Sequence, residues 1–478
     1  MNVRAAATRE PSGWLAGRTR FFLAVAVVAV YATRLAASAG ELLQGDGWFC
    51  LLLGREIADH GLPHEDTLTA LGGGRPWIDV QWLAHSIWHA LREIGGARLV
   101  LVSHVLLLCG ALVLAFDAAR RAGASSRRVA LAGLVALLVL MPQRLVRAQS
   151  FGVLCLVLVL WIAIVDARRG RRTLMWTLPV LVLWANLHGS VLVGVGLAGL
   201  ATLVSASRRT GRARLERLGL GVAIAATPFV TPYSPGELLA YWSKMAGDPG
   251  PFTEWDAPTF ETAPVHVVLA VATLALLVWR ARKVDLLHGV LLGACAILSL
   301  TGLRYGLLLG YAFAVFGPSL LDVVLPGPGH DPRVRAWPLA LAASLAFLAG
   351  LTHGMQHVPG AVGWRYPRAV LATELRGGLV FSSESHGDWL LDQRPDLRGR
   401  VLFGVRSELG SAQEWGAVQD VLGGDLSGLD ALGRDLGQPI RHVVVDREEW
   451  GATEHALEEA DGWTRILRRD GVAVYSRE

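Results

Sequence analysis

The sequence predicts an α-helical polytopic membrane protein of about eleven transmembrane helices, followed by a small C-terminal α/β domain. Three observations support this fold class. The 478 residues are 53% hydrophobic and 18% charged, whereas a soluble domain carries charge on about a quarter of its residues. Long apolar runs recur from residue 21 to about residue 352, and the sequence beyond them gains Gly, Asp and Glu. We therefore expect a membrane domain over residues 1–353 and a soluble domain over residues 354–478.

The apolar runs define the predicted transmembrane segments. In lipid every backbone polar group must be satisfied within the protein, and runs of this length favour helices over barrel strands. The runs 129–141 and 218–230 are the weakest, since a straight span needs ~20 residues. Arg18 and Arg20 precede the first run as in a signal peptide, but we expect an uncleaved helix because many runs follow. The segments are about 21–39, 97–116, 129–141, 151–165, 174–187, 189–206, 218–230, 265–279, 285–302, 305–322 and 337–353.

The distribution of Lys and Arg predicts the topology. With a cytoplasmic N-terminus, the inside loops carry 22 Lys and Arg, and the outside segments up to Arg304 carry seven. This asymmetry follows the positive-inside rule, so the basic excess needs no nucleic-acid partner. We therefore expect the protein in the cell membrane, which is the inner or plasma membrane. Eleven spans then place the C-terminal domain on its extracytoplasmic side. The most basic inside loops are 120–128, 168–172, 208–217 and 280–283.

The C-terminal segment has the pattern of an extracytoplasmic α/β domain. Short β-branched runs predict strands at GGLVFSS, GRVLFG, IRHVVVD and GVAVYSRE, while LDALGRDLG and TEHALEEADGW predict helices. The sequence contains no Walker loop and no GxGxxG after a strand. GVRSELG (404–410) is predicted to be a loop, with a ligand-lining role as the alternative. We expect this domain to cap a cavity or to recognise the acceptor.

Polar residues that interrupt the apolar runs all fall on the outside face of this topology. Each of these residues also has a simpler interpretation. Arg144 and Arg147 could extend their charged ends to the membrane surface, and Trp77 could belong to an aromatic belt. Asn186 and His188 could form hydrogen bonds between packed helices. Polar groups at a membrane edge are costly, so their joint placement on one face predicts an outside-facing polar cavity. The candidate substrate-binding residues are Trp77, Gln81, Arg144, Arg147, Gln149, Asn186, His188, Glu254, Trp255 and Arg304.

The first outside loop, residues 41–96, is the most informative. Asp46 follows the first helix closely, and the residues after it predict a short amphipathic helix at the membrane interface. Glu65 and Asp66 form an acidic pair further along the loop. A divalent metal such as Mg²⁺ or Mn²⁺ is one interpretation, although a glycine and a proline between the two histidines make helical ligand geometry weak. Its oxygen and nitrogen ligands would come from Asp46, His60, His64, Glu65 and Asp66.

These residues resemble the GT-C superfamily of polytopic glycosyltransferases. The resemblance covers about residues 20–320 and rests on Asp46, on the loop that continues as REIADHGLPHEDT and GRPWIDVQWL, and on the polar residues gathered on one side. The chain also resembles uncharacterised bacterial membrane proteins with W-x-N-x-H-G and E-W-x-x-P stretches, here Trp184–Gly189 and Glu254–Pro258. The resemblance implies that Asp46 is a catalytic base or a metal-binding acid. No DxD triplet occurs in the loop, which leaves the metal and the sugar donor open.

The resemblance implies an integral membrane transferase that moves a hexose or pentose from a polyprenyl-phosphate donor to an extracytoplasmic glycan, lipid or protein. Such a transfer needs a base for the acceptor hydroxyl and cations for the departing phosphate, a task suited to Arg144, Arg147 and Arg304. The alternatives are a transporter or flippase of lipid-linked glycans and a non-catalytic membrane assembly protein. Transporters are typically built from repeated halves, and the sequence shows no internal repeat.

Overall fold

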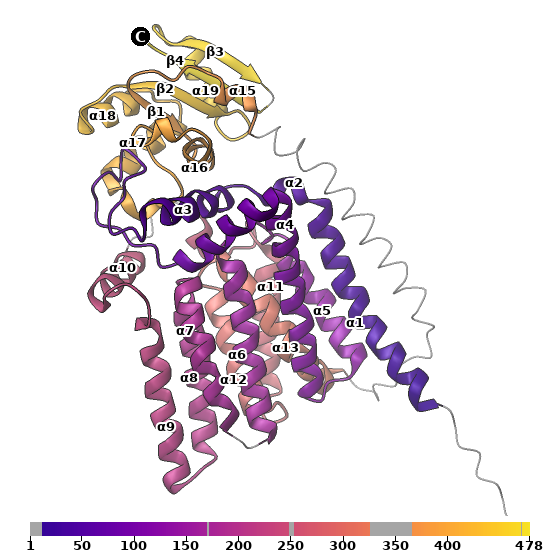
Figure 1. Cartoon of the computed structure of the whole chain (residues 1–478). Coiled ribbons are helices and arrows are strands. Elements are labelled where there is room, and N and C mark those ends of the chain that lie inside the picture. The colour runs from indigo at the N-terminus through magenta and orange to yellow at the C-terminus, as the bar shows by residue number, and fades with distance from the viewer. Residues whose placement is uncertain (1–11, 170–171, 248–252, 326–365, 470) are drawn as a thin grey trace, which may run out of the picture.

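The computed structural model of the protein describes residues 12–169, 172–247, 253–325, 366–469 and 471–478. Within these ranges a bundle of long helices carries a small domain with a four-stranded sheet at one end (Figure 1). Ten of the eleven predicted apolar segments fall in helices of the described residues, and the segment 337–353 lies outside them. The bundle helices are α1 (Ser12–Ala37), α4 (Trp82–Arg121), α5 (Ser126–Leu140), α6 (Gln149–Arg169), α7 (Thr177–Leu187), α8 (Val191–Ser207), α9 (Gly211–Ala226), α11 (Pro264–Trp279), α12 (Leu286–Ser299) and α13 (Gly306–Val324).

Length and composition allow three of the described helices to cross a membrane. These are α4, α6 and the continuous helix Leu303–Val324, and five apolar helices in the described ranges are shorter. The full set of eleven spans, and their orientation in the membrane, stay predictions. Shorter helical elements connect the bundle: α2 (Ala39–Leu42), α3 (Asp46–His60), η1 (Arg172–Trp176), η2 (Thr227–Phe229), α10 (Pro235–Gly247), η3 (Thr253–Trp255) and η4 (Leu303–Tyr305).

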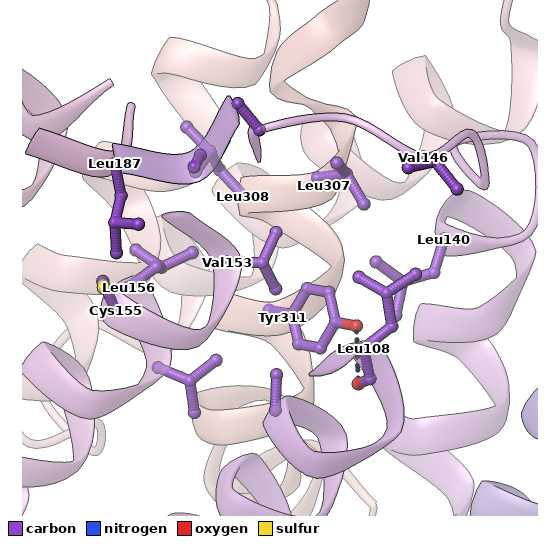
Figure 2. Close-up of a cluster of buried hydrophobic side chains, with 14 of the residues drawn as sticks. Leu108, Leu140, Val146, Val153, Cys155, Leu156, Leu187, Leu307, Leu308 and Tyr311 are labelled. Carbon is purple, nitrogen blue, oxygen red and sulfur yellow. Dashed lines mark hydrogen bonds between the residues drawn. The ribbon is translucent and has the colours of Figure 1, made fainter. Parts of the chain in front are cut away.

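Close helix packing holds the bundle together. A Cβ at Gly310 of α13 would lie 2.5 Å from Leu140 Cδ2 of α5, so glycine is what allows these two helices to approach. Next to it, the buried Tyr311 Oη donates to the Leu108 carbonyl of α4 at 2.9 Å (Figure 2). Aliphatic side chains from several helices surround Tyr311, and this hydrogen bond gives its buried hydroxyl a partner.

The long helix α4 contains a break that positions the site. Gly95 and Gly96 have non-helical backbone angles, and Gly96 has a φ of 65°. The part before the break, residues 82–94, packs with α3 across the end of the bundle (Figure 1). A Cβ at Gly54 of α3 would lie 2.2 Å from the His85 carbonyl oxygen, so the two helices cross in backbone contact. The helix predicted in the first loop is present as α3, at the end of the bundle, while its place at the membrane interface stays a prediction.

One predicted loop needs a correction. Residues 208–217 were expected to form an exposed basic loop, but α9 begins at Gly211. Arg217 is buried, and its Nη2 lies 3.1 Å from Oδ1 of the equally buried Asp166 of α6. A buried carboxylate requires a paired cation, which draws this arginine inside. Arg208, Arg212 and Arg214 remain exposed and Arg209 is half-buried; the segment lies at the end of the bundle away from the C-terminal domain (Figure 1).

The C-terminal domain is an α/β domain whose strands lie in the order β1-β2-β4-β3. β1 and β2 pair in parallel, while β4 is antiparallel to both of its neighbours. Its core is a cluster of aromatic and β-branched side chains that includes Phe381, Trp415 and Val443. The elements are α15 (Arg368–Leu371), β1 (Leu379–Ser382), α16 (Glu384–Gln393), η5 (Pro395–Leu397), η6 (Ser407–Leu409), α17 (Ala412–Leu422), α18 (Ser427–Asp435), β2 (Ile440–Asp446), α19 (Gly451–Glu459), β3 (Thr464–Arg469) and β4 (Val472–Ser476).

Three strand predictions are confirmed here and one is wrong. GRVLFG forms no strand of the sheet; instead Ala70 and Leu71 of the first loop donate their backbone N–H groups to the carbonyls of Val401 and Leu402, at 2.8 and 3.0 Å. Its residues Leu402 and Phe403 are buried in the core of the C-terminal domain, and the first loop pairs with the backbone of the segment. The strand that the sequence did not predict, β3, is an exposed edge strand and lacks the alternating buried pattern. The helices α16 and α17 were also missed.

Ion pairs join the C-terminal domain to the first loop and the start of α4. Asp392 of α16 accepts from Arg92 Nη1 at 2.7 Å, and its carbonyl accepts from Arg55 Nη1 at 2.6 Å. Asp66 of the loop accepts from Arg406 Nη1 at 2.5 Å, and both side chains are almost fully buried. The domain thus rests on α3, in agreement with its place directly above that helix in Figure 1.

Candidate active site

A cavity of about 320 Å³ lies between the end of the bundle and the C-terminal domain. Its walls come from α3, the first loop, the α7–α8 turn, α10, the η3 and η4 turns and the loop 405–408. Among its lining residues are Asp46, Trp77, Asp79, Gln81, His85, Arg147, Gln149, His188, Tyr241, Glu254, Trp255, Arg304, Arg406 and Glu408. We call this cavity the candidate pocket.

Acids and arginines alternate in the candidate pocket. Asp46, the first residue of α3, keeps about a third of its side chain exposed (32%), and Arg147 Nε lies 3.0 Å from its Oδ2. The same guanidinium donates from Nη1 to Glu254 Oε2 at 2.6 Å. Arg304 Nη1 lies 3.6 Å from Glu254 Oε1, and its guanidinium stacks 3.9 Å from the Trp255 ring centroid. Four charged side chains from well-separated segments therefore form one network.

The two acids of this network differ in their electrostatic surroundings. Burial raises the pKa of Asp46 above its usual range, because the opposing effect of Arg147 is weaker and Glu254 adds a like charge. Burial also acts on Glu254, but Arg147 and Arg304 together lower its pKa. Glu254 is therefore the fixed anion of the network, while Asp46 is the more basic carboxylate.

Asp79 and His85 form a second pair in the pocket wall. His85 Nδ1 lies 2.7 Å from Asp79 Oδ2, and the two side chains are 1% and 2% exposed. Asp79 Oδ1 also accepts from the backbone N–H of Gln81 at 2.9 Å. Burial alone would lower the pKa of His85, but the Asp79 carboxylate and the Cys50 side chain raise it to about 10. The imidazole is thus protonated at neutral pH.

The WANLHGS segment forms the turn between α7 and α8, and its two predicted site residues separate. His188 lines the candidate pocket and is neutral, since burial and neighbouring cations lower its pKa to about 3. Its Nδ1 accepts the Ser190 backbone N–H at 3.0 Å. Asn186 lies outside the pocket lining: it accepts from Trp82 Nε1 at 3.0 Å and donates to the Val230 carbonyl at 2.9 Å. Asn186 therefore has the packing role that was its alternative.

Some of the remaining predicted residues line the candidate pocket and others lie outside it. Trp77, Gln81 and Gln149 line the candidate pocket. Arg144 lies in an adjoining cavity of about 220 Å³ and pairs with Glu41 at 2.7 Å. Glu65 is exposed and Asp66 is bound to Arg406, so the predicted acidic pair lies outside the pocket lining.

The predicted metal ligands do not gather at one point. His60 lies 3.2 Å from Glu56, and His64 lies 2.6 Å from Glu237. Within the described ranges, no group of three or more His, Cys, Asp or Glu side chains has an arrangement that would hold a metal ion. The carboxylates of Asp46 and Glu254 instead pair with the guanidinium of Arg147.

Sequence reasoning missed several pocket residues, among them Asp79, His85, Tyr241, Arg406 and Glu408. Two of these belong to GVRSELG, whose ligand-lining role was only the alternative. Trp77 Nε1 donates to Glu408 Oε1 at 2.8 Å, and the Arg406 guanidinium lies 5.0 Å from the Trp77 ring centroid. The sequence placed Arg, Ser and Glu together in that loop, and a capping role was expected for the C-terminal domain, but only the packed fold shows which loop of the domain reaches the pocket.

The fold and the pocket together define a helical membrane protein with a polar site under an α/β cap. No protein-family model and no curated protein matches the sequence. Among solved structures, ArnT from Cupriavidus metallidurans, in a crystal structure bound to undecaprenyl phosphate, matches with a TM-score of 0.50, 16% identity and 98% coverage of each chain. ArnT is a glycosyltransferase of the GT-C family. The expected resemblance to the GT-C superfamily is thereby confirmed at the level of the fold.

Proposed function

We propose that this protein is a GT-C membrane glycosyltransferase that moves a sugar from a polyprenyl phosphate to an acceptor hydroxyl. The observation that carries the proposal is the network of Asp46, Arg147, Glu254 and Arg304 in the candidate pocket. It lies at the end of a bundle whose fold is similar to that of ArnT, a protein solved with undecaprenyl phosphate bound. The acceptor is a glycan, lipid or protein on the side of the C-terminal domain.

Asp46 is the proposed catalytic base. The acceptor hydroxyl gives its proton to the Asp46 carboxylate while its oxygen forms a bond to the anomeric carbon of the sugar. The bond from that carbon to the phosphate oxygen breaks on the opposite face, and polyprenyl phosphate leaves. A carboxylate with a raised pKa is a stronger base than an ordinary aspartate, and it remains a base as long as it is ionised.

Arg147 and Arg304 are the proposed phosphate-binding residues. Negative charge grows on the phosphate as it leaves, and a guanidinium can donate two parallel hydrogen bonds to it. Glu254 contacts both arginines and would hold them in place before the donor binds. Apolar helix faces would hold the polyprenyl tail in the bilayer. No step of this mechanism requires a divalent metal.

The test is the substitution Asp46→Asn in the purified protein, supplied with a panel of radiolabelled polyprenyl-phosphate sugars. We expect the release of polyprenyl phosphate to fall at least about a hundredfold, the range attributed to a general base. Glu41→Gln is the matched control, because Glu41 also pairs with an arginine but lies outside the pocket lining. Release at the normal rate in Asp46→Asn would contradict the proposal. Passage of an intact lipid-linked glycan across a vesicle membrane, without release, would favour a flippase.

A further inference from the structure

The Asp79–His85 pair lies close to the proposed base. Asp46 and Cys50 are four residues apart on α3, so they share one face of that helix, and both line the candidate pocket. The His85 ring packs edge-on against Phe49, three residues after Asp46 on α3, with 5.3 Å between ring centroids, and the Cys50 side chain helps to raise its pKa. His85 is therefore about one helical turn from Asp46 along α3.

The His85 ring is fixed in this orientation from three sides. Its Nδ1 lies 2.7 Å from Asp79 Oδ2. Phe49 restricts the ring edge-on. The backbone of His85 is held against α3, because the crossing at Gly54 leaves no space for even a Cβ. The His85 ring therefore lies against α3, with Asp79 bound to its Nδ1.

The charges that face Asp46 come from every element packed around it. Positive charge comes from Arg147 and Arg304, and from the ring of His85; the acids are Glu254, with Glu384 and Asp388 of the C-terminal domain. The groups that act on His85 itself are Asp79 and Cys50. Without the imidazolium, Asp46 would lose one of the three cations that favour its ionised form. Glu384 and Asp388 belong to the cap, where burial raises the pKa of both carboxyls and Arg406 opposes the shift of Asp388.

We propose that His85 is a positioning residue whose protonated ring, held by Asp79, keeps Asp46 ionised beneath the C-terminal domain and so able to accept the acceptor proton. The catalytic part of this statement rests on the function proposed above. His85 itself need not touch the substrate, because its charge acts on the Asp46 carboxylate through the pocket. A merely structural role would be limited to joining the first loop to α4.

Infrared titration of the purified protein tests this inference without any substrate. The protonated-carboxyl band that disappears in Asp46→Asn reports the ionisation of Asp46. We expect this band to titrate about one pH unit higher in His85→Gln, because an opposite charge has been removed. His89→Gln is the matched control: it is the same substitution one turn further along α4, outside the pocket lining, and should leave the titration unchanged.

Asp79→Asn provides the second variant. It leaves the imidazole in place but removes the carboxylate that keeps it charged. The Asp46 band should therefore also titrate at a higher pH. The pH below which transfer activity falls should rise by the same amount. An unchanged Asp46 titration in both variants would overturn the inference. Normal transfer by Asp46→Asn together with the shifted band would refute Asp46 as the base, yet leave the electrostatic role of His85 standing. The two failures are therefore distinguishable.

Discussion

The guanidinium of Arg147 lies 3.0 Å from the carboxylate of Asp46, although α3, a long loop and the bundle helices α4 and α5 separate them in the sequence. Arg147 follows α5 in a short connecting stretch, and Asp46 begins α3. Both segments emerge at the same end of the bundle, where α3 lies across the helix ends (Figure 1). The contact joins the proposed base to the proposed phosphate site, so the charge state of one depends on the other.

Arg147→Gln should weaken the binding of undecaprenyl phosphate. A hydrogen bond to a charged group contributes about 1.5–3 kcal/mol, so its loss should raise the dissociation constant roughly tenfold to a hundredfold. Arg144→Gln is the matched control, because Arg144 belongs to the same connecting stretch but pairs with Glu41 outside the candidate pocket. Binding to the protein in detergent is measured by tryptophan fluorescence. Equal losses in both variants would show that the site is elsewhere.

Docking of the C-terminal domain should depend on Asp66 and Arg406. Arg406→Ala leaves the buried Asp66 carboxylate without its cation, which should destabilise the docked domain by about 3–5 kcal/mol. Arg75→Ala breaks the more exposed pair with Glu414, whose cost should stay near 0.2–1 kcal/mol. Limited proteolysis and thermal unfolding measure both. If the two variants behave alike, the buried pair does not hold the cap.

The stability of the cap should fall as the pH rises from about 4 to 7. Burial raises the pKa of Asp388 from 3.8 to about 7, although Arg406 opposes this shift. A carboxyl whose pKa is higher in the folded state stabilises that state fully below the unfolded value, and this contribution is lost as the pH rises through 7. Three pKa units correspond to about 4 kcal/mol, an order-of-magnitude figure for a fully buried group.

Asp388→Asn isolates this effect, since asparagine resembles the protonated acid and does not titrate. The midpoint of thermal unfolding should vary less with pH in this variant than in the parent protein. Asp396→Asn is a suitable control, because Arg394 holds the pKa of that carboxyl below its usual range. An identical pH slope in the parent and in Asp388→Asn would exclude Asp388 as its source.

Chelation of divalent metals should leave transfer unchanged. The phosphate charge is assigned to Arg147 and Arg304, and the described residues contain no group of three or more suitable metal-binding side chains. The purified protein is treated with EDTA, and sugar transfer is compared before and after dialysis. Loss of activity that Mg²⁺ or Mn²⁺ restores would require a metal held in part by the substrate phosphate.

The apolar runs determined the helical bundle, because their length and spacing depend on local composition alone. Ten predicted segments coincide with described helices for this reason. The same logic found Asp46, Arg147, His188, Glu254 and Arg304, since polar residues at the ends of apolar helices must lie near the membrane edge. Asn186 satisfied the same pattern but packs between helices, because only the neighbouring side chains distinguish a lining residue from a packing one.

The sequence by itself determined the class of the protein, the change to a soluble domain and one face rich in polar groups. The tertiary structure alone decided which of those groups meet. Asp79 is paired with His85 because α3 and α4 cross at Gly54, and Arg406 reaches the pocket because a distant domain docks on the first loop. Hydrophobic periodicity is a local property of the chain, whereas a buried ion pair depends on distances that only the packed fold establishes.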